Sequence, residues 1–260
     1  MSSLGSTSFD RAARHLGVYL RHLLGGDGVT LDHRYVRLVS GEPHPLGNLA
    51  VMESIGDVSA VSEAAAPLQS LAMPSAVILP GVASREVVER LSAMGFLERE
   101  KSPAMVLDLD ALTRPTRPPD AVFEALDSGA QGEEWVETLA EGYGIPVGVA
   151  RRFLPTPVPD GAGLPSPVAL YGIRMGRRLV ACSACALGDG VAGIYCVATI
   201  PEARGRGLGR SVTAEPLRRA RELGFRQAVL QSSSEGHRMY QQMGFHDLGD
   251  LDMFIRFPCP

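Results

Sequence analysis

The chain has 260 residues, of which 45% are hydrophobic and 21% are charged, and its formal net charge is −4. This balance excludes a disordered chain and allows one large domain or two ordinary ones, since domains commonly hold about 50 to 250 residues. Residues 1–119 carry 13 acidic and 11 basic side chains, and residues 120–260 carry 16 and 14, so each half has a net charge of −2. Neither half has the excess positive charge that is typical of a nucleic-acid-binding domain.

The hydropathy pattern gives no sign of membrane insertion or export. No apolar run approaches the roughly 18–20 residues that cross a bilayer. The first residues, MSSLGSTSFD, lack the charged and then apolar order of a signal peptide. We therefore expect no membrane association and a cytoplasmic location.

The four cysteines do not have the spacing of a metal or redox site. Cys182 and Cys185 form a C-x-x-C, but they lie in the apolar segment LVACSACAL, which is typical of a strand. Positions three apart on a strand point to opposite faces. Cys196 and Cys259 have no second such motif beside them. The sequence predicts reduced thiols and no bound metal.

The first half of the chain predicts helices and strands in alternation. Helical spacing covers residues 9–24 and 85–95, and strand patterns cover residues 35–41, 76–81 and 104–112. No catalytic arrangement is visible in this half. Its histidines are scattered without metal-ligand spacing and are expected to be ordinary residues; they are His15, His22, His33 and His44.

A proline-rich segment separates the two halves. Residues 112–120, LTRPTRPPD, hold three prolines, which exclude a helix interior and a central strand. We expect a linker here and two domains, residues 1–114 and 115–260.

The second half predicts a mixed α/β domain, with a central sheet flanked by helices. Strand patterns cover residues 121–127, 168–176, 177–189, 191–200, 227–233 and 245–257, and helical patterns cover 132–144, 146–154, 211–224 and 235–244. Residues 154–167 are rich in proline and glycine and are expected to form a loop. The central sheet would receive a crossover that runs from a strand through a glycine turn into a helix.

The glycine turn RGRGLG leads from the strand IYCVATI into the helix RSVTAEPLRRA. The first N–H groups of a helix have no internal partner and carry partial positive charge, so such a turn can bind an anion. Arg210 stands where a dinucleotide motif has its third glycine, and a P-loop would need Gly-Lys-Ser/Thr. On spacing alone, a diphosphate cradle and a plain surface connector both remain open. The cradle would comprise Arg204, Gly205, Arg206, Gly207, Leu208, Gly209 and Arg210.

Residues 197–245 resemble the acetyl-coenzyme A-binding half of the GNAT superfamily of N-acetyltransferases. The family's R/Q-x-x-G-x-G/A turn, which follows its fourth strand, is matched by Arg204, Gly207 and Gly209. A later signature, a small polar residue, a tyrosine on a short helix and Gly-Phe, is matched by Ser233, Tyr240, Gly244 and Phe245. The two motifs stand in the family's order and at its separation.

The resemblance implies transfer of an acetyl or other acyl group from acyl-coenzyme A to a primary amine of a small molecule or peptide. The pantetheine arm would pair with the main chain of Val197, Ala198 and Thr199. The N–H of Val197 or Ala198 would polarise the thioester carbonyl, and the phenol of Tyr240 would protonate the leaving thiolate. Many relatives have asparagine where this sequence has Ser233, which leaves that cofactor contact open.

Several neighbouring residues have open roles. Ser233 or Ser234 would cap the helix of Tyr240, and Gly236 would lie at the cofactor. His237 is a proton relay or a surface residue, and Pro216 would bend the preceding helix. The general base is not assigned; Glu134, Glu137 and Glu141 are candidates, and Trp135 and Tyr143 are candidates for the pocket wall.

Two other functions remain open on the sequence. The domain could bind coenzyme A as a regulatory module without turnover, or it could take an aminoacyl group from transfer RNA. The second would need a basic track, for which Arg151, Arg152, Arg174, Arg177 and Arg178 are available. The net negative charge argues against it, and oligomeric state is not predicted.

Residues 85–112 are similar to the end of the N-terminal half of bacterial two-domain members of the family. In those proteins a degenerate acetyltransferase-like domain precedes the active one. Met94-Gly95-Phe96 echoes Met243-Gly244-Phe245, but the first half has no R-x-x-G-x-G turn. We expect this half to pack against the second or shape its substrate site, without a cofactor of its own.

Overall fold

The computed structural model describes residues 3–23, 28–113, 116, 118–155 and 168–258. The helices are α1 (Ser3–Leu23), α2 (Val58–Gln69), α3 (Arg85–Ala93), α4 (Ala130–Tyr143), α5 (Val147–Arg151), α6 (Leu208–Glu222) and α7 (Ser234–Gln242). The strands are β1 (Val29–Leu31), β2 (Tyr35–Val39), β3 (Asn48–Met52), β4 (Ser75–Leu79), β5 (Glu98–Asp108), β6 (Ala121–Leu126), β7 (Val168–Met175), β8 (Arg178–Gly188), β9 (Val191–Thr199), β10 (Gln227–Gln231) and β11 (His246–Arg256). This confirms the mixed α/β class.

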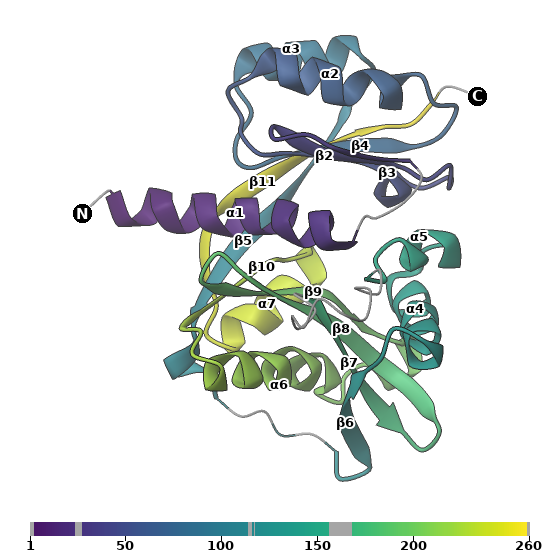
Figure 1. The fold of residues 1–260 in the computed structure, drawn as a ribbon, viewed down its shortest axis with the longest axis vertical. Coiled ribbons are helices and arrows are strands. Elements are labelled where there is room, and N and C mark those ends of the chain that lie inside the picture. The colour runs from purple at the N-terminus through teal and green to yellow at the C-terminus, as the bar shows by residue number, and fades with distance from the viewer. Residues whose placement is uncertain (1–2, 24–27, 114–115, 117, 156–167, 259–260) are drawn as a thin grey trace, which may run out of the picture.

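Eleven strands of the described residues form one mixed sheet, in the order β1-β2-β3-β4-β11-β5-β10-β9-β8-β7-β6. The two halves exchange strands at its centre (Figure 1). β5, from the first half, pairs antiparallel with β10, and β11, from the end of the chain, pairs antiparallel with β4 and β5. The two halves therefore share a continuous sheet. The expected domain boundary between residues 114 and 115 lies outside the described residues and stays a prediction.

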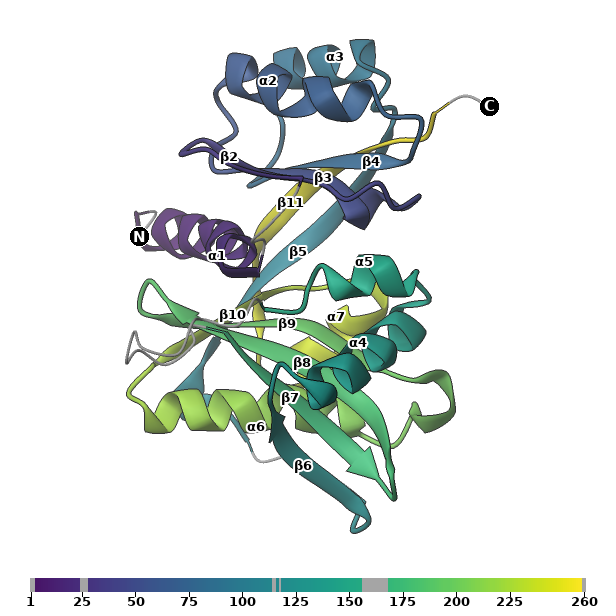
Figure 2. The same cartoon turned by 45° about the vertical axis from the view of Figure 1, so that its right-hand side comes forward.

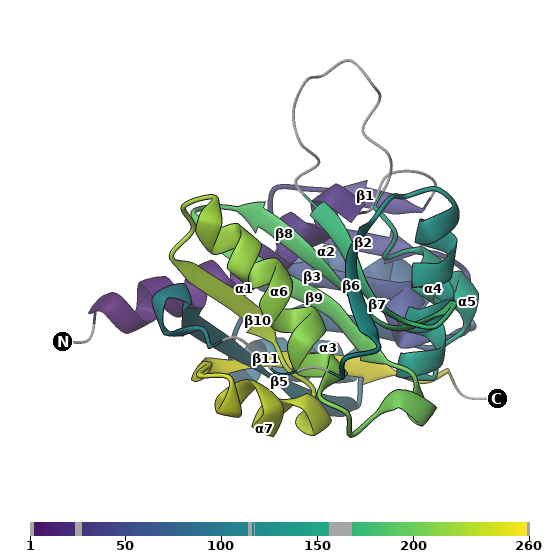
Figure 3. The same ribbon diagram turned by 90° about the horizontal axis from the view of Figure 1, so that it is seen from below.

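Helices cover both faces of this sheet. α2 and α3 lie over one face of β2 to β4, and α1 runs between the two halves (Figures 1 and 2). In the second half, α4 and α6 pack on opposite faces of β8 and β9. Seen from below, α6 lies in front of the strands of the second half (Figure 3). The glycine turn leads directly into α6.

The alternation expected for the C-x-x-C segment is confirmed. Cys182 packs with Trp135 on the α4 face, whereas Cys185 packs with Leu217 on the α6 face. Cys182, Cys185 and Cys196 are free thiols, and no group of three metal-binding side chains occurs among the described residues. Cys259, the side chain of His22 and residues 156–167 of the expected loop lie outside what the structure describes.

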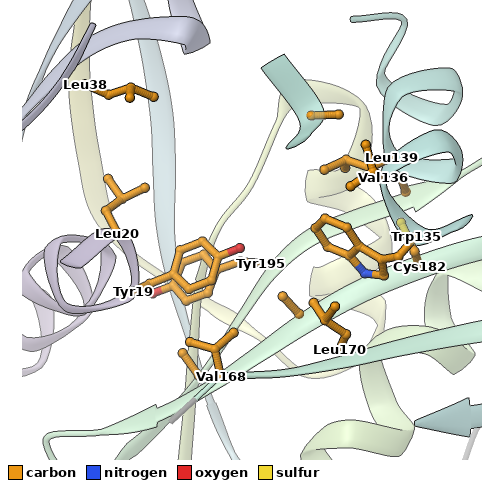
Figure 4. Close-up of a cluster of buried hydrophobic side chains, with 14 of the residues drawn as sticks. Tyr19, Leu20, Leu38, Trp135, Val136, Leu139, Val168, Leu170, Cys182 and Tyr195 are labelled. Carbon is orange, nitrogen blue, oxygen red and sulfur yellow. The ribbon is translucent and has the colours of Figure 1, made fainter. Parts of the chain in front are cut away.

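Trp135 anchors an apolar cluster that joins the two halves. The side chain is completely buried, and its indole N–H donates to the carbonyl of Ser183 at 3.0 Å. Figure 4 shows it beside Val136 and Leu139 of α4, with Tyr19 of α1 across the cluster. Packing of this cluster fixes α4 against β8 and β9.

Replacing Trp135 with alanine is expected to lower the free energy of unfolding by about 3–5 kcal/mol, because it removes a large buried ring and leaves Ser183 O without its donor. Urea unfolding followed by circular dichroism measures this, since Trp135 is the single tryptophan and its fluorescence would be lost. Leu223→Ala, at a 70% exposed position, is the control and should change stability by less than about 0.5 kcal/mol. An equal loss in both variants would contradict the anchoring role.

Candidate functional site

A cleft of about 1070 Å³ opens where the end of β9 meets the beginnings of α6 and α7 and the end of α4. It lies at the edge where two parallel strands separate. β10 pairs with β9 only at Ala192 and Gly193, although β9 continues to Thr199. Among the residues that the structure describes, the last part of β9 therefore has a neighbouring strand, β8, on one side only.

The exposed edge of β9 presents its main chain to the cleft. Ile200 N–H donates to Val180 O at 3.0 Å, and Ala198 is aligned with Cys182 of β8. Because main-chain groups alternate along an antiparallel ladder, Val197 faces the opposite edge from Ala198. Of the two amides proposed to polarise a carbonyl, that of Val197 has the better direction.

A β-bulge lies immediately before Val197. The register of β8 and β9 shifts between Cys182 and Ala184, and Cys196 on the bulged strand has a φ of 52°. A non-glycine residue in this left-handed region costs about 1–3 kcal/mol, so the surrounding structure must hold it there. Bulges of this kind change the direction in which the next residues point.

The glycine turn has the geometry of an anion cradle. Gly205 and Gly207 both have a φ of 76°, and α6 begins at Leu208 without a side-chain cap. The first amides of α6 have no partner within the helix. A Cβ on Gly209 would lie 3.2 Å from Sδ of Met239, so a side chain here would press on α7.

The arginines of the turn contact protein groups. Arg204 donates to Gly142 O at 2.7 Å and to Thr199 O at 3.2 Å, which ties the end of α4 to β9. Arg210 bonds to the amide oxygen of Gln242. Arg206 lies 3.6 Å from Asp120 in an exposed ion pair. Protein groups thus hold all three guanidinium groups, and those of Arg204 and Arg210 line the cleft beside the main chain of the turn.

The later motif forms the other wall of the cleft. Ser233 caps α7 by accepting from Gly236 N–H at 3.1 Å, so Ser233 rather than Ser234 is the cap. The Tyr240 ring is 7% exposed and meets the Phe245 ring edge to face at 5.8 Å. Burial raises the pKa of Tyr240, and a hydrogen bond with Thr213 lowers it in part.

Twelve of the thirteen predicted site residues line the cleft, and Arg206 does not. The twelve are Val197, Ala198, Thr199, Arg204, Gly205, Gly207, Leu208, Gly209, Arg210, Ser233, Gly236 and Tyr240. The lining residues without a predicted role are Gly142, Gly144, Pro201, Ala203, Gln231, Glu235 and Met239. The N-cap preference of Ser233 pointed to the start of α7, and the open candidates Glu141 and Tyr143 pointed to the end of α4.

The open candidates divide between the cleft and other surfaces. Glu141 and Tyr143 line the cleft, and the Glu141 carboxylate accepts from Arg178 at 2.7 Å. His237 bonds to Asp247 at 2.7 Å and does not line the cleft, which favours the surface interpretation over the relay. Glu134, Glu137 and Trp135 also do not line it.

Tyr143 is the second tyrosine of the cleft. Tyr143 is 46% exposed and lines the cleft. Burial by the surrounding walls raises the pKa of its phenol, and the nearby Cys196 and Tyr240 groups raise it further. Two protonated phenols therefore line the same cleft.

Residues 121–245 match the model of the Acetyltransferase (GNAT) family. The chain carries a GNAT acetyltransferase domain. It is an acyltransferase whose donor is an acyl-coenzyme A, and the GNAT domain contains the whole cleft described above. No helix among the described residues is long and apolar enough to cross a membrane.

Solved structures extend the likeness beyond the GNAT domain. A GCN5-related N-acetyltransferase from Kribbella flavida superposes with a TM-score of 0.63 at 20% identity, covering 94% of this chain and 95% of that one. A GCN5-related N-acetyltransferase from Sphaerobacter thermophilus gives 0.56 at 18% identity, covering 72% and 61%. A functionally unknown conserved protein from Staphylococcus epidermidis gives 0.56 at 12% identity, covering 90% and 95%. No curated protein matches the sequence. These likenesses concern the fold alone.

The first half repeats part of the GNAT domain's arrangement without its cradle. β3, α2, β4 and α3 follow one another as β9, α6, β10 and α7 do, and Ser84 caps α3 as Ser233 caps α7. The start of α2 differs, because the Asp57 carboxylate accepts from Ala60 N–H at 2.9 Å. A diphosphate at this helix end would meet a negative charge.

Proposed function

We propose that the protein transfers an acetyl group, or another acyl group, from acyl-coenzyme A to a primary amine of a small molecule or peptide. The observation that carries this proposal is the position of the glycine cradle at the mouth of the gap between β9 and β10. Both features open into the same cleft, within a GNAT domain. The cleft volume, about 1070 Å³, is slightly above the range of about 300–1000 Å³ that is typical of ligand pockets.

The residues present fit an acyl-coenzyme A. The left-handed glycines bring the main chain to the cleft surface, and the first amides of α6 would hold the diphosphate. The free edge of Val197 to Thr199 would pair with the pantetheine arm, as a neighbouring strand would. When bound, acyl-coenzyme A supplies an activated acyl group as a thioester.

The chain's own groups then have distinct tasks. Val197 N–H would donate to the carbonyl oxygen on which negative charge develops, and a fixed donor of this kind contributes about 3–4 kcal/mol. The Tyr240 phenol, protonated at neutral pH, would donate its proton to the departing sulfur. Of the three candidate carboxylates, that of Glu141 lines the cleft. It is paired with Arg178, so the general base stays unassigned.

We also propose that the first half shapes the substrate site and binds no cofactor of its own. Asp57 at the start of α2 supports this, because it occupies the position equivalent to the cradle. Ser84 and Gly95-Phe96 keep the helix cap and the Gly-Phe of the other signature, but Leu91 stands where that signature has its tyrosine, so the likeness is structural rather than functional.

The charge distribution argues against transfer RNA as the donor. Arg151 pairs with Glu133, Arg174 with Glu124 and Glu134, and Arg178 with Glu141. These pairs neutralise most of the arginines that could form a basic track, and nucleic-acid binding depends on unneutralised positive charge.

Calorimetry with coenzyme A and acetyl-coenzyme A, followed by a thiol-release assay over amines, tests the proposal. Binding with release of free thiol in the presence of small amines, peptide N-termini or lysine side chains is expected. Binding without transfer to any acceptor would favour the regulatory module. The absence of binding would overturn the proposal, and a gel shift with charged transfer RNA that weakens steeply with salt would favour the other donor.

A further inference from the structure

Helix α1 of the first half bridges the two strands that separate at the cleft. On β9, the Tyr19 ring stacks on the Tyr195 ring with centroids 4.0 Å apart and planes inclined by 8° (Figure 4). On β10, Gln231 donates from its side chain to Ala12 O at 3.0 Å, and Arg11 bonds to Gln227 at 3.1 Å. The first half is thus fixed to both sides of the gap.

The hydroxyl of Tyr19 contacts the bulge itself. It lies 3.2 Å from Sγ of Cys196, and the Tyr19 side chain is 1% exposed. Burial raises the pKa of the Tyr19 phenol, and it raises the pKa of the Cys196 thiol to about 12, so both groups are neutral at physiological pH. A neutral hydrogen bond therefore connects α1 to the residue before Val197.

Cys196 needs such a contact because its backbone is left-handed within a strand. A thiol side chain disfavours this conformation, which persists only where neighbours enforce it. The Cys182 thiol, 3.8 Å from Cys196 O, holds the main chain from one side. The Tyr19 hydroxyl holds the side chain from the other.

We propose that Tyr19 is a positioning residue for acyl transfer, which fixes the bulge at Cys196 and thereby directs Val197 N–H into the cleft. The inference rests on the proposed function. It adds a role for the first half of the chain, which would take part in the reaction through α1. Tyr19 does not line the cleft and acts through Cys196.

The test compares two tyrosines of one stack. Tyr19→Phe removes the hydroxyl at the bulge and keeps the ring, whereas Tyr195→Phe removes the hydroxyl that bonds to His15 at 2.8 Å. We expect kcat of Tyr19→Phe to fall about tenfold, since small misplacements of a reacting group are costly, while its KM for acyl-coenzyme A stays within about twofold. Tyr195→Phe should keep its kcat within about twofold of the wild type. Equal kcat values for the two variants would overturn the proposal.

A second comparison distinguishes an effect of Tyr19 on the bulge at Cys196 from a general loss of packing. Glycine adopts a positive φ freely, so Cys196→Gly should retain the bulge without help from Tyr19. Adding Tyr19→Phe to Cys196→Gly should then change kcat by less than about twofold, in a double-mutant cycle. A full tenfold loss in that background would show that Tyr19 acts elsewhere.

An infrared readout does not depend on turnover. The carbonyl stretch of bound acetyl-coenzyme A, labelled with ¹³C at the carbonyl, reports the donor at Val197. We expect the band to move toward its free-solution position in Tyr19→Phe and to stay at the wild-type position in Tyr195→Phe. An unchanged band in Tyr19→Phe would overturn the inference even if transfer to every amine failed, and failure of wild-type transfer alone would concern the proposed function.

Discussion

Gly207→Val is expected to weaken acyl-coenzyme A binding by about 100-fold. Gly207 has a φ of 76° at the start of α6, where a β-branched residue costs about 1–2 kcal/mol. Relief of that strain would turn the first amides of α6 away from the cleft, and each lost hydrogen bond to a charged group costs about 1.5–3 kcal/mol. Loss of two such bonds amounts to about 3 kcal/mol, which corresponds to about 100-fold in Kd.

Calorimetry of the purified apoprotein measures this loss, and Arg206→Ala is the matched control. Arg206 is the neighbouring residue, it does not line the cleft, and its exposed pairing with Asp120 contributes little. We expect its Kd to stay within about threefold of the wild type. A large loss in Arg206→Ala with normal binding in Gly207→Val would show that guanidinium charge, and not the main chain, holds the anion.

The parts of the site that the sequence predicted lie within short stretches of chain. The glycine turn and the first turn of α6 occupy residues 204–210, and the cap of α7 and Tyr240 lie within 233–240. Local rules decide such features, because a positive φ calls for glycine and a helix start calls for a serine cap. The directions of the side chains were harder to predict. Arg206 stands between two glycines, and no local rule indicates that its side chain points toward Asp120.

The parts that the sequence did not predict depend on distant partners. β3 is buried along all five residues and shows no alternation, and α2 contains Pro67, so neither had a clear pattern. β5 begins at Glu98, six residues before the predicted strand, because its exposed polar start reaches across to β11. The contact of Tyr19 with Cys196 joins residues 177 positions apart, and no spacing rule covers that distance.

Tyr240→Phe is expected to lower kcat by about 100-fold or more, the usual contribution of a general acid, with little change in KM for acyl-coenzyme A. The ring would keep its edge contact with Phe245, so thermal unfolding should stay close to that of the wild type. Because burial raises the pKa of Tyr240 above its ordinary value near 10, the phenol keeps its proton throughout the neutral range. Loss of the acid through deprotonation is shifted to higher pH, so the wild type should show no fall in kcat from this group below about pH 10.

Tyr143→Phe is the matched control, because Tyr143 is the other phenol of the cleft and its side chain is 46% exposed there. If Tyr240 is the acid, Tyr143→Phe should retain kcat within about threefold at every pH. A normal kcat in Tyr240→Phe together with a lowered kcat in Tyr143→Phe would indicate that the proton donor lies at the end of α4. The leaving thiolate would then be protonated from α4, the helix to which Arg204 of the glycine turn is bonded at Gly142 O. Comparing kcat of both variants across pH 6–10 therefore decides which wall of the cleft supplies the proton.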